Sequence, residues 1–218
     1  FARGRTSRDL SLHVPKTAQR WGARLPRHLS PEGVEAVLAH VREHPRCGAR
    51  DYAMLLLMAR LGLRAVEVVA IQLEDIDWRS GELTVRGKGK FHDRVPMTAE
   101  VGEALSRYLR DERGRTRCRS VFVTHRAPHR AFRNSEMINI ILREALSATG
   151  QKPAVPFVGS HLLRHSLATG LVNAGASLEE VSDVLRHRTR ASTMIYARLD
   201  IDGLRSVARP WPVAEGAE

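Results

Sequence analysis

The stretch His161–Thr169, which reads HLLRHSLAT, is the part of the sequence on which the interpretation of the fold depends. It is typical of a helix, and His161 and His165 stand four residues apart, a spacing that can present two imidazoles to zinc. A zinc metalloprotease needs the glutamate of H-E-x-x-H, however, and Leu162 stands in its place. No third ligand has a convincing spacing, so the sequence predicts no metal site. His161 and Arg164 instead share one helix face, where both can contact one anionic group, while His165 is interpreted as a structural histidine.

The charge of the chain predicts a polyanionic partner. Its 218 residues include 35 Lys and Arg against 24 Asp and Glu, a formal net charge of +11, which favours nucleic acid. The hydrophobic fraction of 43% is that of a globular protein and excludes a disordered basic tail. No apolar run approaches the roughly 20 residues of a membrane span, and two cysteines are too few for a disulfide framework. We therefore expect a cytoplasmic protein, associated with the nucleoid when it is bound to DNA.

Periodicity predicts a mainly α-helical fold with one small antiparallel β-sheet, an α+β class. Ser30 is a capping residue for the first helix, which is followed by proline and glutamate. The expected helices cover 31–45, 49–61, 65–73, 98–110, 135–148, 160–174, 178–185, 190–199 and 202–208. The expected strands cover 76–78, 82–86, 94–97 and 121–124.

Three further clusters carry polar groups that can do chemistry. Arg64 stands where an apolar helix breaks, and it either pairs with Glu67 three residues later or points at an anion from the start of the next helix. Gly87–Lys90 lies between two strands and lacks the pattern of a P-loop, so it is interpreted as a hairpin turn with exposed lysines. Tyr196 follows His187 by nine residues and, taken alone, is a core or interface residue. Ser166 lacks the G-x-S-x-G elbow of a serine hydrolase.

Taken together, these clusters resemble the catalytic domain of the tyrosine recombinases, the phage integrase family. The pattern of that family is an arginine in G-L-R-x-x-E, a lysine in a β-hairpin, then H-x-x-R, and a histidine nine residues before the nucleophilic tyrosine. The residues that match it are Arg64, Lys88, His161, Arg164, His187 and Tyr196, with Glu67 as the glutamate. The resemblance covers about residues 29–208. Arg186 departs from it, because the family usually has glycine there, and so does Leu61, where Thr or Ser is frequent.

The resemblance implies the tyrosine recombinase/type IB topoisomerase catalytic-domain fold and a metal- and ATP-independent reaction without cofactors. Tyr196 would attack a DNA phosphate and form a 3′-phosphotyrosyl intermediate. Arg64, Arg164 and His187 would stabilise the transition state, with Glu67 orienting Arg64. A hairpin lysine would protonate the leaving 5′-oxygen with help from His161. Lys88 is the better match for this lysine, although Lys90 is close enough to leave the assignment open.

The resemblance also implies partners and boundaries. Residues 1–28 are expected to be a basic linker from an N-terminal core-binding domain, residues 29–208 the catalytic domain, and 209–218 a tail. Double-stranded DNA is the expected partner, in a homo-oligomer that is a tetramer of two dimers and is joined through the helix 201–208. The candidate DNA contacts are Lys90, Arg94, Arg186, Arg20 and Arg24.

Two alternatives share these features: DNA relaxation by a type IB topoisomerase, and a DNA-binding accessory protein without catalysis. The sequence names neither the DNA site nor the task, which is integration, excision, transposition or chromosome-dimer resolution.

Overall fold

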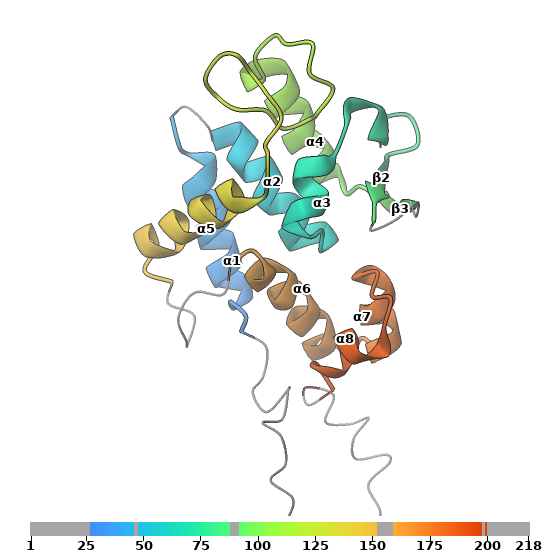
Figure 1. Ribbon diagram of the computed structural model, residues 1–218. Coiled ribbons are helices and arrows are strands. Elements are labelled where there is room, and N and C mark those ends of the chain that lie inside the picture. The colour runs from blue at the N-terminus through green and yellow to red at the C-terminus, as the bar shows by residue number, and fades with distance from the viewer. Residues whose placement is uncertain (1–26, 46–47, 88–91, 152–158, 198, 200–218) are drawn as a thin grey trace, which may run out of the picture.

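The computed structural model describes residues 27–45, 48–87, 92–151, 159–197 and 199. Lys88, Lys90, Arg20, Arg24 and the segment 201–208 lie outside the described residues. Helices are α1 (Pro31–Arg42), α2 (Gly48–Leu61), α3 (Ala65–Ala70), α4 (Ala99–Arg107), α5 (Glu136–Ala148), α6 (His161–Asn173), α7 (Leu178–Val184) and α8 (Arg190–Met194). The strands β1 (Ile76–Asp77), β2 (Glu82–Arg86) and β3 (His92–Pro96) form an antiparallel sheet in the order β1-β2-β3. The predicted class, mainly helical with one small antiparallel sheet, is confirmed (Figure 1).

Helix α2 lies at the centre of the larger hydrophobic core. Its run Leu55–Met58 is 0–1% exposed, as expected of a helix that is apolar on all sides. Helix α1 covers it with one apolar stripe, and the start of α1 is fixed by the Ser30 side chain, which accepts a hydrogen bond from the Gly33 amide at 3.2 Å. Helices α4 and α5 also pack against α2, so the core holds α2 and the turn that follows it in one position.

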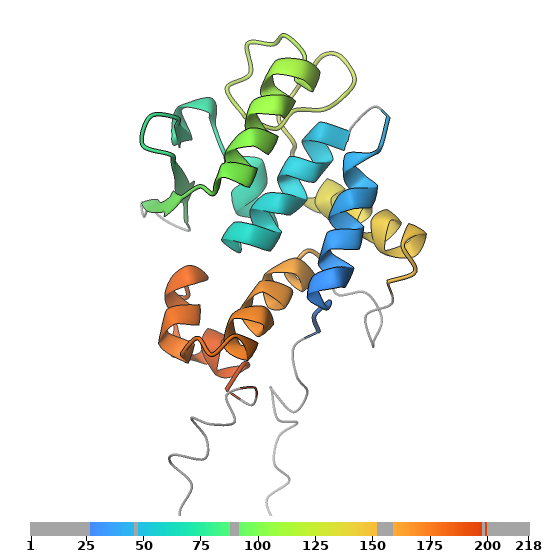
Figure 2. The same ribbon diagram turned by 180° about the vertical axis from the view of Figure 1, so that it is seen from behind.

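Helix α6 joins this core to a second, smaller one. Leu162 and Leu163, in its first turn, belong to the larger core. Ala168 and Val172 belong to the second, together with the buried side chains of α7 and of the residues after α8 (Val181, Leu185 and Tyr196). Figures 1 and 2 show α6 running from the larger core to α7 and α8. The position of Tyr196 is therefore set by α6 and α7.

One predicted strand and several predicted boundaries are wrong, among them the end of the first helix, which is Arg42 and not residue 45. Residues 121–124 are not a strand, because their backbone makes only isolated bridges (Gln72 with Ser120, Val123 with Ala131), although Val121, Phe122 and Val123 are buried. The helix predicted over 65–73 ends at Ala70, since the carboxylate of Asp75 accepts from the Gln72 amide at 2.8 Å and starts a 3₁₀ turn. The helix predicted over 190–199 ends at Met194 and continues as turns. The helix predicted to reach residue 110 ends at Arg107 and passes into a π-helical turn, Tyr108–Glu112.

Among the helices of the described part, none is both long enough and apolar enough to cross a membrane.

We expect Leu56→Ala to lower the free energy of unfolding by roughly 2 to 5 kcal/mol, because it opens a cavity beside a side chain that is 0% exposed. The matched control is Val66→Ala on α3, where the side chain is 60% exposed and the change should stay within about 0.5 kcal/mol. Urea denaturation measures both. Equal effects of the two substitutions would contradict the assignment of α2 to the centre of the core.

Candidate active site

The turn between α2 and α3 requires a glycine at residue 62. Gly62 has a φ of +60°, in the left-handed region that favours glycine. A Cβ atom there would also lie 2.8 Å from Cδ2 of Leu185, at the end of α7. The turn before Arg64 is therefore in direct contact with the turn before His187, although more than 120 residues separate them.

Arg64 and Glu67 form the ion pair that the sequence offered as one of two interpretations. The Arg64 amide donates to Glu67 Oε2 at 2.8 Å, and its guanidinium donates to Oε1 at 2.7 Å. The glutamate is buried, whereas the arginine side chain is 35% exposed. Burial alone would raise the pKa of Glu67, but hydrogen bonds from Arg64 and the charges of Arg186 and Arg64 outweigh it and lower that pKa. Glu67 is thus an ionised carboxylate that holds Arg64 at the start of α3.

Arg164 lies at the centre of the site. It is 3% exposed, and its guanidinium donates to the backbone carbonyls of Gly62 and Leu185. Burial, together with the positive charges of Arg64 and Arg186, lowers its pKa to about 10. The group nevertheless stays protonated at neutral pH. A guanidinium carries five N–H donors, so these two carbonyls leave it further donors for a ligand.

Two neutral imidazoles lie beside these arginines. His187 shares a hydrogen bond of 2.8 Å between its Nδ1 and Thr193 Oγ1, which leaves Nε2 for a ligand. Burial, followed by the charges of Arg164 and Arg64, lowers the pKa of His187 to about 4. The side chain of His161 is exposed at the start of α6, and partial desolvation and the same two arginines lower its pKa as well.

Tyr196 is turned into the second core. Its side chain is 1% exposed, and its hydroxyl forms a 2.5 Å hydrogen bond with Nδ1 of His165. Burial raises the pKa of Tyr196 to about 12, and the charge of Arg164 opposes this only in part. The pKa of His165 falls to about 4, chiefly through burial and then through the charges of His161 and Arg164. Both partners are therefore neutral at pH 7.

The structure brings six of the predicted residues to one place. The charge of Arg164 acts on His161, His187 and Tyr196, and Arg64 and Glu67 face it across the α2–α3 turn. Arg94 does not join them: it lies on β3 with a 78% exposed side chain, 3.5 Å from Glu82. Lys88 and Lys90 fall outside the described residues.

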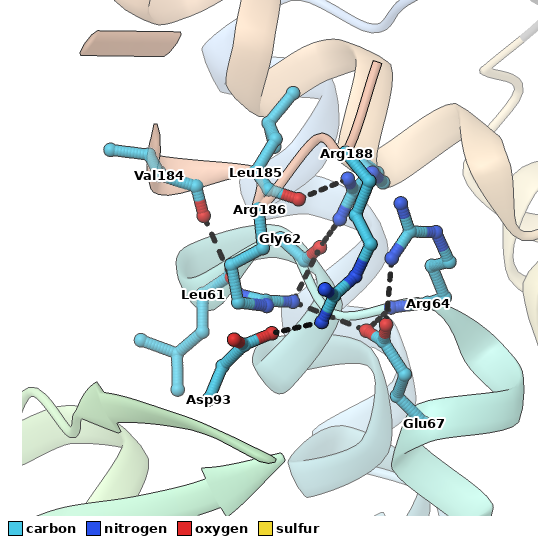
Figure 3. A network of polar contacts seen from close by, with 10 residues as sticks. Leu61, Gly62, Arg64, Glu67, Asp93, Val184, Leu185, Arg186 and Arg188 are labelled. Atoms are coloured by element: carbon cyan, nitrogen blue, oxygen red, sulfur yellow. Dashed lines mark hydrogen bonds and ion pairs between the residues drawn. The ribbon is translucent and has the colours of Figure 1, made fainter. Parts of the chain in front are cut away.

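Two residues at this site make contacts that the sequence did not indicate. His165 was interpreted as structural, and its only sequence signal is its place next to Arg164. Arg186 was predicted to contact DNA, yet its side chain is only 10% exposed and reaches Glu67 Oε2 at 3.1 Å (Figure 3).

The site is suited to an anion. Three guanidinium groups lie at the site, those of Arg64, Arg164 and Arg186. Arg64 and Arg186 contact the Glu67 carboxylate, and the described residues place no other carboxylate in hydrogen-bond contact with the three groups. Nor does the described part of the chain contain a group of three or more His, Cys, Asp or Glu able to hold a metal ion. Guanidinium forks of this kind match the oxygens of a phosphate.

Comparison with known proteins agrees with this chemistry. Residues 27–202 match the phage integrase family. A putative integrase/recombinase of Sinorhizobium fredii, y4rA, is 42% identical over 96% of this chain, and the aligned region is 51% of that protein. The tyrosine recombinase XerD of Ralstonia nicotianae is 36% identical, over 84% of this chain and 59% of its own length. The crystal structure of the XerA recombinase superposes with a TM-score of 0.69 at 28% identity, over 84% of this chain and 64% of that one. The chain thus spans about half the length of its curated relative y4rA.

The lowered pKa values of His165 and His187 predict acid sensitivity. The folded protein holds both imidazoles neutral down to about pH 4, whereas the unfolded chain protonates them near pH 6.5. Their contribution to stability is therefore complete above pH 6.5 and is lost as the pH falls towards 4. We expect the free energy of unfolding to drop between pH 7 and pH 5 by on the order of 1 to 2 kcal/mol for each histidine.

Urea denaturation at the two pH values measures this drop. His165→Asn keeps an acceptor for the Tyr196 hydroxyl and should reduce the drop, whereas His92→Asn on the exposed surface of β3 should not. The same drop in wild type and His165→Asn would contradict the assignment.

Proposed function

The chain belongs to the phage integrase family, and on that premise we propose that it is the catalytic domain of a site-specific tyrosine recombinase. It cuts and rejoins DNA strands through a covalent protein–DNA intermediate. The observation that carries this proposal is the excess of guanidinium charge beside a tyrosine hydroxyl and two neutral imidazoles. Such a set matches a phosphodiester, whose transition state gathers negative charge on its non-bridging oxygens.

In this reaction the Tyr196 oxygen attacks the phosphorus of the scissile phosphodiester. A bond forms between that oxygen and the 3′-phosphate, the bond to the 5′-oxygen breaks, and the leaving strand takes up a proton. The phosphotyrosyl ester retains the energy of the broken bond, so rejoining needs no ATP. Arg64 and Arg164 donate to the non-bridging oxygens, and His187 adds a donor through Nε2. Loss of one such donor should cost on the order of 10²–10³ in rate.

The two proton transfers are assigned to different groups. The hairpin lysine, Lys88 or Lys90, protonates the 5′-oxygen, and the neutral His161 assists. Tyr196 must lose its proton when it attacks, and the neutral imidazole of His161 is the proposed acceptor. Its pKa of about 12 means that it does not ionise before DNA binds. Attack on a phosphate beside Arg164 also requires the Tyr196 hydroxyl to leave its hydrogen bond with His165, which holds the ring in the second core.

Duplex DNA is the proposed partner, attracted by the net charge of +11. The proposed backbone contacts are Arg94, Lys90, Arg20 and Arg24. The basic residues 1–28 act as the linker to a core-binding domain, 29–208 as the catalytic domain, and 209–218 as the tail. The protein then works in the cytoplasm, on the nucleoid.

Assembly on DNA is proposed as a tetramer of two dimers, joined through residues 201–208. Ile201, Leu204 and Val207 give this segment an apolar face at helical spacing. A cavity of about 550 Å³ between the start of α1 and α6, lined in part by Val34 and Leu167, offers a place for the same segment of a neighbouring copy. This assembly distinguishes a recombinase, which pairs two sites, from a topoisomerase, which does not.

We predict that a nicked suicide DNA carrying the recombination site traps the chain as a covalent complex, and that Tyr196→Phe traps none while binding the same DNA. Tyr52→Phe is the matched control, because this substitution removes only the hydrogen bond from the Tyr52 hydroxyl to Glu100, far from the site. Denaturing gel electrophoresis detects the adduct. If the wild type binds the DNA without forming an adduct, the chain is an accessory protein instead.

We also predict that Leu204→Asp abolishes strand exchange between two sites and leaves cleavage of a single site intact, because it puts a charge on the apolar face of 201–208. Exchange is measured on two labelled duplexes, with relaxation of a siteless supercoiled plasmid in parallel. Exchange by Leu204→Asp at the wild-type level would contradict assembly through this segment. Relaxation without exchange by the wild type would identify a topoisomerase.

A further inference from the structure

The backbone of Arg186 adopts a conformation that residues other than glycine rarely adopt. Its φ is +53°, and it is the one residue other than glycine with a positive φ in the described part of the chain. In this left-handed region the Cβ atom crowds the following carbonyl, which is why glycine or asparagine is the usual occupant. The side chain must therefore make contacts that compensate for this backbone.

Those contacts are specific and internal. The two terminal guanidinium nitrogens donate to the Leu61 carbonyl at 3.1 Å and to Glu67 Oε2 at 3.1 Å, with longer contacts to the carbonyls of Gly62 and Val184. Figure 3 shows Arg64 and Arg186 both directed at Glu67, the first from the α3 side and the second from the turn after α7. The side chain of Arg186 is 10% exposed and that of Glu67 is 7% exposed.

We propose that Arg186 is a positioning residue for strand cleavage, which holds Glu67 against Arg64 and fixes the turn of His187 on the turn of Arg64. This inference rests on the proposed recombinase function. Glu67 uses one oxygen for the Arg64 guanidinium and the other for the Arg64 amide and Arg186. Arg186 thus orients the Glu67 carboxylate, which in turn orients Arg64, a donor to the phosphate.

The geometry favours this role over contact with DNA. The terminal nitrogens of Arg186 already donate to protein oxygens, and its Nε is buried from solvent without a hydrogen-bond partner. A phosphate can reach this guanidinium only if the turn opens. Gly62 also links Arg186 to the centre of the site, because Arg164 donates to the same Gly62 carbonyl. The two arginines therefore connect α7 to the α2–α3 turn side by side.

The test is single-turnover cleavage of a suicide DNA by the full chain at saturating protein, with the DNA dissociation constant measured separately. Arg186→Gly removes the contacts and suits the backbone angle, so it isolates the side chain from strain. We expect the cleavage rate to fall about tenfold or more while the dissociation constant changes less than about twofold. Arg186→Lys should restore part of the rate, since an ammonium reaches the carboxylate but not all the carbonyls.

Arg188→Ala is the matched control. It removes the same charge two residues later, where the side chain is 50% exposed and lies 3.8 Å from Asp93. We expect its cleavage rate to stay within about twofold of the wild type. An unchanged rate for Arg186→Gly would overturn the proposal. A larger DNA dissociation constant, with an unchanged cleavage rate at saturating protein, would overturn the proposal as well and assign Arg186 to DNA contact.

A cycle with Glu67→Gln separates this proposal from the proposed function. We expect Arg186→Gly/Glu67→Gln to cleave no more slowly than the slower single variant, because the two side chains act as one unit. Thermal unfolding of the wild type, the two single variants and the double variant measures the coupling between the two side chains without an activity assay. Additive shifts of Tm would overturn the proposal. If the wild type forms no adduct, the recombinase assignment fails, while the Tm cycle still decides whether Arg186 and Glu67 are coupled.

Discussion

The buried guanidinium of Arg164 is the group on which the rest of the site depends. It donates to the carbonyl of Gly62, at the end of α2, and to that of Leu185, at the end of α7. Since α6 itself packs into both hydrophobic cores, this one side chain holds the two cores in register. Arg64 and Glu67 are placed by one of the two turns that it joins, and Arg186 and His187 by the other. Losing it would remove the side-chain donor from the Leu185 carbonyl and leave the Gly62 carbonyl with only the long contact from Arg186, which is costly in a protein interior.

The electrostatics of the site follow from the same packing. Burial places Arg64 and Arg186 on the Glu67 carboxylate and Arg164 beside them. Burial, and after it the charges of Arg164 and Arg64, lowers the pKa values of His161 and His187. The pKa of Arg164 itself falls to about 10, first through burial and then through the positive charges of Arg64 and Arg186. A phosphate would restore the balance, whereas an additional structural carboxylate would compete with it. The site is therefore prepared for a substrate anion before one is present.

Much of this could be predicted from the sequence because it is local. Apolar spacing gave the helices, and the three-residue interval between Arg64 and Glu67 already offered their ion pair. The buried loop at Val121 was mistaken for a strand, because an apolar run looks the same whether or not its backbone pairs. The sequence left the direction of Tyr196 open between a core or interface residue and a nucleophile, since its spacing from His187 says nothing of which way the ring turns. The contacts of Arg186 join residues about 120 apart in sequence, and no pattern within one helix reveals them.

The central claim, that Tyr196 is the residue that becomes covalently bonded to DNA, is tested most directly by identifying the residue that carries the nucleotide. The adduct trapped on a suicide DNA is digested with nuclease and trypsin, and the modified peptide is sequenced by mass spectrometry. Arginines at 190 and 198 place Tyr196 in the tryptic peptide 191–198. We expect the nucleotide mass on Tyr196 in that peptide. A nucleotide on Tyr52, Tyr108 or a serine would contradict the assignment of the whole site.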